Sequence, residues 1–187
     1  MSDGNAATPA SAFRQFSLNV YKTPQVEQVC LDLQDTHGLD VNLLLLCCWV
    51  GRHGVRLPTD TLRRAEQAVA PWRETAIEPL RDLRRRLKTS VGGIGAETAA
   101  GLREKIKSAE LDAEFLEQDH LVTLMDHLPG TDGRRADRAG LVRGNLIRYA
   151  GLKGIAAQDV PRQAFETLVT AAVPDTDDPE TTTGQSD

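Results

Sequence analysis

The sequence predicts an all-α protein, a single-domain helical bundle around a central apolar helix at about residues 41–51, with one long helix at about 96–128. Apolar residues recur at spacings of three and four, whereas the alternation of apolar and polar residues that marks strands is scarce. Glycines cluster between these periodic segments. Aromatic residues make up 4% of the chain, so a core must consist mostly of Leu, Val, Ile and Ala.

Two helices are predicted in the first part of the chain. Residues 1–10 are small and polar, and we expect them to be disordered. A first helix spans about Ser11–Lys22, and Pro24 then opens a second helix at its favoured N-terminal position. Gly38 ends that helix as a left-handed cap, with Leu39 as its hydrophobic contact. The inward stripe of the second helix is predicted to be Val26, Val29, Cys30, Leu33 and His37.

The run VNLLLLCCWV, residues 41–50, is apolar on all sides and therefore predicts a helix surrounded by others. It is about half of the ~20 residues that a membrane-spanning helix requires, so we expect a soluble protein. Asp40 is positioned to cap this helix with its carboxylate. Asn42 either faces solvent and assists the cap or is buried and orders a polar pocket.

Proline positions divide the next part of the chain. Residues 51–58 predict a loop, and Thr59 or Asp60 caps a fourth helix. A fifth helix begins at Pro71 and continues to Lys88, and Pro79 should kink it.

A flexible joint is expected at VGGIG, residues 91–95, before the long helix. Apolar residues of the long helix alternate by four and three, as in a coiled-coil seam. The members of this predicted seam are Leu102, Ile106, Ala109, Ala113 and Leu116.

Two further helices complete the predicted domain, which spans residues 11–173. One holds Leu141, Leu146, Ile147 and Tyr149, and the last is capped by Asp159 with Pro161 in its first turn. Residues 174–187 form an acidic, Thr-rich tail that we expect to be disordered.

The cysteines and histidines do not form a recognisable site. Cys30, Cys47 and Cys48 match no zinc or disulfide spacing and are interpreted as reduced core thiols in a cytoplasmic protein. Glu117 and His120 have the Glu-x-x-His spacing of di-iron bundles, but no second such motif exists to complete the site. We therefore expect no catalytic residues, no metal and no cofactor.

A basic stretch near residue 85 gives the strongest functional hypothesis. Arg81, Arg84, Arg85 and Lys88 share one helical face, while Leu80, Leu83 and Leu87 are predicted to bury the other. This basic face either binds an anionic partner or only faces water and pairs with acidic neighbours. The acidic candidates for such pairing are Glu74, Glu78, Glu110, Glu114 and Glu117, and a second basic cluster is Arg134, Arg135, Arg138 and Arg143.

An alternative site is polar rather than basic. Gln34, Asp35, Asp40 and Asn42 cluster around the start of the apolar run and form a possible polar pocket for a small ligand. Under this alternative the protein is a small-ligand-binding protein or an enzyme.

Several segments resemble a proteobacterial family of small proteins of unknown function. They are FRQFSLNVY (13–21), CLDLQDTHGLDVNLLLLCCW (30–49), APWR (70–73) and PLRDLRRRLK (79–88). The family is typified by FSLxxY, LQDxxGxDVNLLL and WR…PLRxLRR segments, and the resemblance is strong over residues 12–90. It implies a bacterial cytoplasmic protein and supplies no catalytic residues.

These observations predict a non-catalytic interaction or regulatory module that presents a basic helix face to an anionic partner. That partner is an acidic protein surface or a nucleic-acid backbone. The net charge of −5 argues against bulk non-specific binding of nucleic acid but permits a local basic patch. The acidic tail is expected to compete with the partner for this face.

Overall fold

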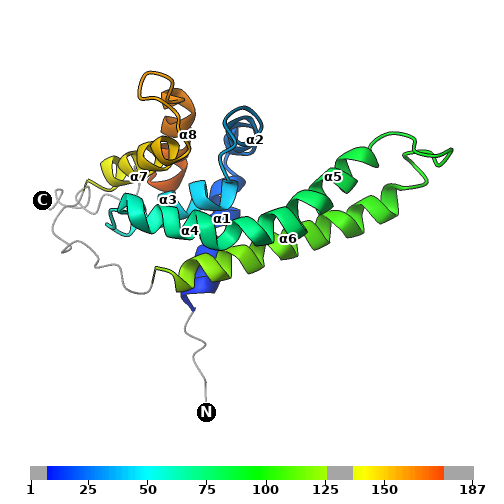
Figure 1. Ribbon diagram of the computed structural model, residues 1–187, viewed down its shortest axis with the longest axis horizontal. Coiled ribbons are helices and arrows are strands. Elements are labelled where there is room, and N and C mark those ends of the chain that lie inside the picture. The colour runs from blue at the N-terminus through cyan, green and yellow to red at the C-terminus, as the bar shows by residue number, and fades with distance from the viewer. Residues whose placement is uncertain (1–7, 126–136, 175–187) are drawn as a thin grey trace, which may run out of the picture. The chain divides into compact units, whose positions relative to one another are not determined.

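The computed structural model describes residues 8–125 and 137–174, and the fold is all-α as predicted (Figure 1). Within these ranges the only β-type pairing is an isolated bridge between Val91 and Ile94. Most of the predicted disordered start (1–7), Arg134, Arg135 and the acidic tail from residue 175 lie outside the described residues.

The described residues group into two compact units. The first, here called the hairpin unit, comprises residues 8–14 and 63–125. The second, here called the central-helix unit, comprises residues 15–62 and 137–174. The boundaries fall inside α1 (Pro9–Tyr21) and α4 (Thr59–Trp72), so each of these helices belongs to both units. The single domain expected over residues 11–173 stays a prediction.

The central-helix unit is built around α3 (Val41–Arg52), as the apolar run predicts. This helix packs against α2 (Val26–His37), α7 (Arg138–Leu152) and α8 (Arg162–Ala172). Each side chain from residue 43 to residue 48 is at most 3% exposed, so the run is core. Asn42 is also buried, which rules out the expectation that it faces solvent.

The hinge before α3 has the predicted caps. Gly38 adopts a left-handed φ of 63° and its N–H donates to the carbonyl of Gln34. The Gly38 bond to Gln34 is that of the αL type of C-cap, and next to it the Leu39 N–H donates to the Leu33 carbonyl at 3.3 Å while the Leu39 side chain is fully buried. The Asp40 carboxylate accepts a hydrogen bond from the Leu43 N–H at 2.9 Å.

The hairpin unit corrects the prediction that a new helix begins at Pro71. Pro71 lies inside α4, which continues into a π-helical turn, Arg73–Ile77, and then into α5 (Glu78–Arg86). In the wider turn the Glu78 N–H donates to the Arg73 carbonyl, five residues earlier. Pro79 has no N–H to donate, so a change of helix type just before it adjusts the hydrogen-bonding register.

Three other helix starts differ from the predictions. Gln25 takes a left-handed φ of 72°, so Pro24 lies in a turn and α2 starts after it. Asp159 does not cap α8, because the residue that precedes this helix is Pro161, which makes no side-chain cap. The Asp159 N–H instead donates to the Ala156 carbonyl and closes a turn. The long helix, α6, spans Ala100–Thr123 and runs alongside α5 (Figure 1).

Candidate functional site

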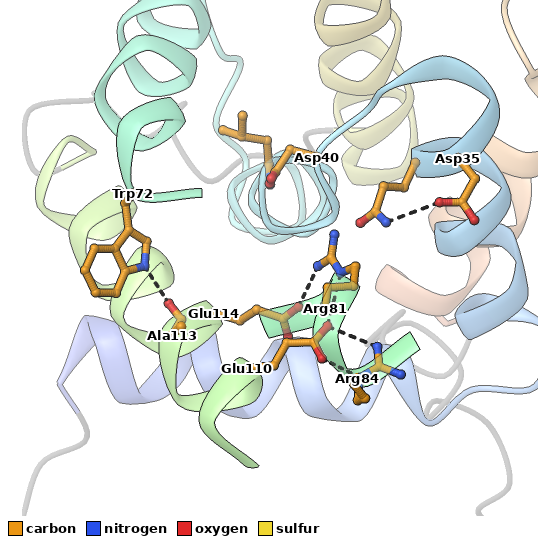
Figure 2. A network of polar contacts seen from close by, with 10 residues as sticks. Asp35, Asp40, Trp72, Arg81, Arg84, Glu110, Ala113 and Glu114 are labelled. Atoms are coloured by element: carbon orange, nitrogen blue, oxygen red, sulfur yellow. Dashed lines mark hydrogen bonds and ion pairs between the residues drawn. The ribbon is translucent and has the colours of Figure 1, made fainter. Parts of the chain in front are cut away.

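The basic face of α5 is oriented differently from the prediction. Arg81 Nε and Nη2 donate to Glu110 at 3.1 Å and to Glu114 at 2.9 Å, both on α6 (Figure 2). Arg84 donates to the same Glu110 carboxylate through Nε at 2.5 Å and Nη2 at 3.1 Å. Leu83, predicted to be buried, is 45% exposed, and α5 has no fully buried residue. The helix turns these arginines toward α6 because α6 offers carboxylates on the facing side.

The carboxylate that the two arginines share is buried. Glu110 is only 5% exposed. Burial alone would raise the pKa of Glu110, but the hydrogen bonds from Arg84 and Arg81 lower it below its ordinary value. Burial opposes the charge of Arg81, yet Glu114 and Glu110 raise the pKa of that guanidinium. Of the acidic neighbours considered from the sequence, these two carboxylates hold the two inward arginines.

The predicted four-residue basic face therefore splits into two pairs. Arg81 and Arg84 cross-link α5 to α6, and their side chains are 15% and 23% exposed. Arg85 and Lys88 are exposed, as is Arg86, which lies beside them in the sequence. The inner pair thus has a structural role, whereas the exposed basic residues remain on the surface.

The end of the hairpin is an ordered turn rather than the flexible joint expected from VGGIG. Val91 and Ile94 exchange two backbone hydrogen bonds of 3.0 Å around Gly92 and Gly93. Both glycines have positive φ, 58° and 84°, which a two-residue turn of this kind requires. The Ser90 hydroxyl donates to the Ile94 carbonyl at 3.1 Å. The turn holds Val91 at 49% and Ile94 at 58% exposure.

The other end of the hairpin unit is fastened by two contacts. Trp72 Nε1 donates to the Ala113 carbonyl on α6 at 3.0 Å (Figure 2). Arg14 of α1 pairs with Asp119 through both nitrogens of its fork, with Nε at 2.7 Å from Oδ1, and stacks over the Phe115 ring. Anchored there, α6 presents its carboxylates to α5 in a fixed register.

The four residues of the alternative polar pocket lie in different environments. Asp40 and Asn42 are buried, Gln34 is half-buried and Asp35 is exposed. The Asp40 carboxylate already caps α3, and Gln34 makes a 3.5 Å contact with the Asp35 carboxylate. The Asp40 contact serves the backbone and the Gln34 contact joins two neighbouring side chains, so neither by itself defines a ligand site.

A buried polar pair on α7 was missed by sequence reasoning. Asn145 is fully buried and bonds the backbone at Cys47, Val55 and Leu57. Tyr149, one turn later, accepts a hydrogen bond from the Asp40 N–H at 2.9 Å. The only signal in the sequence is an Asn and a Tyr four residues apart within an otherwise apolar helix face.

The members of the second basic cluster that the structure describes are Arg138 and Arg143. Arg143 pairs with Glu166 at 2.5 and 2.7 Å, and Arg138 is exposed.

The two residues of the Glu-x-x-His metal candidate lie in different surroundings, because Glu117 is buried whereas His120 is exposed. Among residues 8–125 and 137–174 there is no group of three or more His, Cys, Asp or Glu that could hold a metal ion.

Comparison with known families gives one match. The model of a family described as a protein of unknown function, DUF2390, matches residues 12–121, more than half of the chain. The chain belongs to this family. The resemblance to an uncharacterised family is thereby confirmed. No curated protein and no solved structure matches the chain.

The DUF2390 match begins inside α1 and contains α2 to α5 and nearly all of α6, including the whole arginine–glutamate network. The polar pair on α7 lies beyond it. In the described part of this DUF2390 protein, no helix is both long enough and apolar enough to cross a membrane.

Proposed function

We propose that this protein is a non-catalytic interaction module of the bacterial cytoplasm that binds an anionic partner through the end of the α5–α6 hairpin. We define the hairpin end as residues 85–107. The observation that carries the proposal is the exposure of Arg86 and Lys88 beside an exposed apolar turn, on a hairpin whose Arg81 and Arg84 pair with carboxylates of α6. A cytoplasmic setting fits three buried free thiols.

Charge is concentrated at the hairpin end. Residues 85–107 contain six Lys or Arg and two Glu, a local net charge of +4 in a chain whose net charge is −5. The Debye length in physiological salt is ~8 Å, so acidic residues farther away than this do little to cancel the local potential. Arg86 and Lys88 are exposed and carry part of this charge to the surface.

The apolar turn favours an acidic protein surface over a nucleic-acid backbone. Val91 and Ile94 project from a turn that is held by its own hydrogen bonds, so little entropy is lost when they bind. A phosphate backbone offers nothing against which these side chains can be buried, whereas a protein groove does. The proposed partner is therefore a protein with acidic residues around an apolar depression.

Charge reversal tests the proposal. A double variant, Arg86→Glu with Lys88→Glu, should lose the proteins that the wild-type chain captures from a lysate of its source organism at low salt. The matched control, Lys22→Glu with Arg162→Glu, makes the same change in net charge at exposed positions outside the hairpin and should retain them. Capture by the wild type should also weaken as salt rises.

Two results would count against the proposal. Full capture by the Arg86→Glu and Lys88→Glu variant would show that the hairpin end only faces water. Loss of all captured proteins after nuclease treatment would show that nucleic acid is the partner. Removal of residues 174–187 should strengthen capture if the acidic tail competes for the same surface.

A further inference from the structure

A row of exposed residues runs along α6 at heptad spacing. The spacings between its members are three, four, three and four, the average of 3.5 at which two helices pack side by side. The row lies about a quarter-turn from the buried residues Ile106 and Ala113. Its members are Leu102, Lys105, Ala109, Asp112 and Leu116, all exposed. Leu102 and Leu116 are each 55% exposed, so with Ala109 three of the five residues of the predicted seam are not buried within the hairpin.

This row is complementary to itself. A leucine stands at each end and a small residue, Ala109, at the centre. Lys105 lies on one side of the centre and Asp112 lies nearly as far on the other. The two charges are seven residues apart, about 10.5 Å along the helix, and so cannot pair with each other within one helix.

We propose that α6 pairs with α6 of a second copy of this chain, antiparallel, about a two-fold axis beside Ala109. That axis brings Leu102 against the partner's Leu116 and Lys105 against the partner's Asp112. Each contact then occurs twice, as in any two-fold interface. The small side chain of Ala109 permits close approach of the two helices at the axis.

Charge fixes the direction of the pairing. A parallel pair would place Lys105 against the partner's Lys105 and Asp112 against the partner's Asp112, which is repulsive. Only the antiparallel pair places each Lys105 against an Asp112 of the other copy while it also brings the leucines together. Few apolar side chains take part, and a standard interface buries about 800 Å² per partner, so the dimer is weak.

A charge swap tests the pairing with the full chain. Sedimentation over a concentration series up to about 1 mM should show a monomer–dimer equilibrium for the wild type. Lys105→Asp alone and Asp112→Lys alone should each weaken association at least about tenfold, because each places like charges face to face. An equimolar mixture of the two single variants should associate again as a heterodimer. Lys107→Asp, an exposed charge change on another side of α6, is the control and should leave association unchanged.

Two single cysteine variants test the position of the two-fold axis. Under the thiol oxidant diamide, Ala109→Cys should form a disulfide-linked dimer, whereas Ser108→Cys, which points elsewhere, should not. The three native cysteines are buried and do not compete. A wild type that stays monomeric over the whole series, or a mixture of single variants that fails to associate, would overturn the proposal. Asp112→Lys and Ala109→Cys lie outside residues 85–107 and leave Arg86 and Lys88 in place, so with these variants partner capture and self-association can fail independently.

Discussion

The side-chain oxygen of Asn145 accepts a hydrogen bond from the Leu57 N–H at 2.9 Å, although the two residues are 88 positions apart. The same amide group donates to the carbonyls of Val55 at 3.0 Å and Cys47 at 3.3 Å. At the other end of α3, in the hinge that precedes the helix, the Asp40 N–H donates to the Tyr149 hydroxyl. One face of α7 thus holds both loops that flank the central helix.

Replacing Asn145 with Leu should destabilise the protein by about 2–4 kcal/mol, because a buried N–H and two carbonyls lose their partner. Urea unfolding measures the effect as a lower midpoint with an unchanged slope. Asn19→Ala, at an exposed position of α1, is the control and should stay within about 0.5 kcal/mol of the wild type. Equal midpoints for the wild type and Asn145→Leu would show that the bonds to α7 contribute nothing net.

Gly51 and Gly151 should respond oppositely to substitution by Ala. A Cβ at Gly51 would lie 2.8 Å from Val142 Cα, so α3 and α7 must separate, and overpacking of this kind costs about 1–3 kcal/mol. A Cβ at Gly151 meets no atom within 4 Å, and Ala is favoured over Gly in a helix by up to about 1 kcal/mol. Thermal melts should place Gly51→Ala below the wild type and Gly151→Ala at or above it. A rise in melting temperature for both variants would contradict the close approach of α3 and α7 at Gly51.

Features that depend on neighbouring residues could be predicted from the sequence. The cap on α3, the left-handed Gly38 and the apolar run are all encoded within a few residues of where they act. The helical spacing of the apolar residues gave the all-α fold for the same reason. Asn42 was the exception, because the burial of a first-turn residue depends on what packs over it.

Features that depend on distant residues could not be predicted. Glu110 was considered as a partner for the arginines, but which arginines it holds is set by the register of α5 against α6. That register depends on the π-helical turn and the tight turn at Val91, neither of which the sequence pattern shows. The Asn145 contacts are beyond local reasoning for the same cause.

The cysteines should be unreactive in the folded protein. Burial raises the pKa of the Cys30 thiol to about 12 and raises the pKa of Cys47 and Cys48 as well, from an ordinary value of 9.0. A thiol reagent at pH 8 should label none of the three in buffer and all three in urea. Because the unfolded thiols ionise first, their contribution to stability is complete below pH 9 and is lost as pH rises above that value. Rapid labelling without urea would show that the core opens readily.

Glu110→Gln should separate the structural role of the inner arginines from any role in binding. The wild-type carboxylate accepts from both Arg81 and Arg84, so the neutral amide leaves two guanidinium groups with weaker partners. We expect a loss of about 1.5–3 kcal/mol at pH 7, measured by urea unfolding.

The loss caused by Glu110→Gln should depend on pH in one direction only. The hydrogen bonds from Arg84 and Arg81 hold the folded pKa of Glu110 below 4.5, even though burial opposes them, so its stabilisation is complete above that pH. As pH falls through the lowered pKa, the wild-type carboxylate takes up a proton and the difference between wild type and variant shrinks. Glu104→Gln, an exposed position on the same helix, should show little difference at any pH. If the wild type and Glu110→Gln differed by the same free energy of unfolding at pH 7 and well below pH 4, the charge of Glu110 would not stabilise the hairpin.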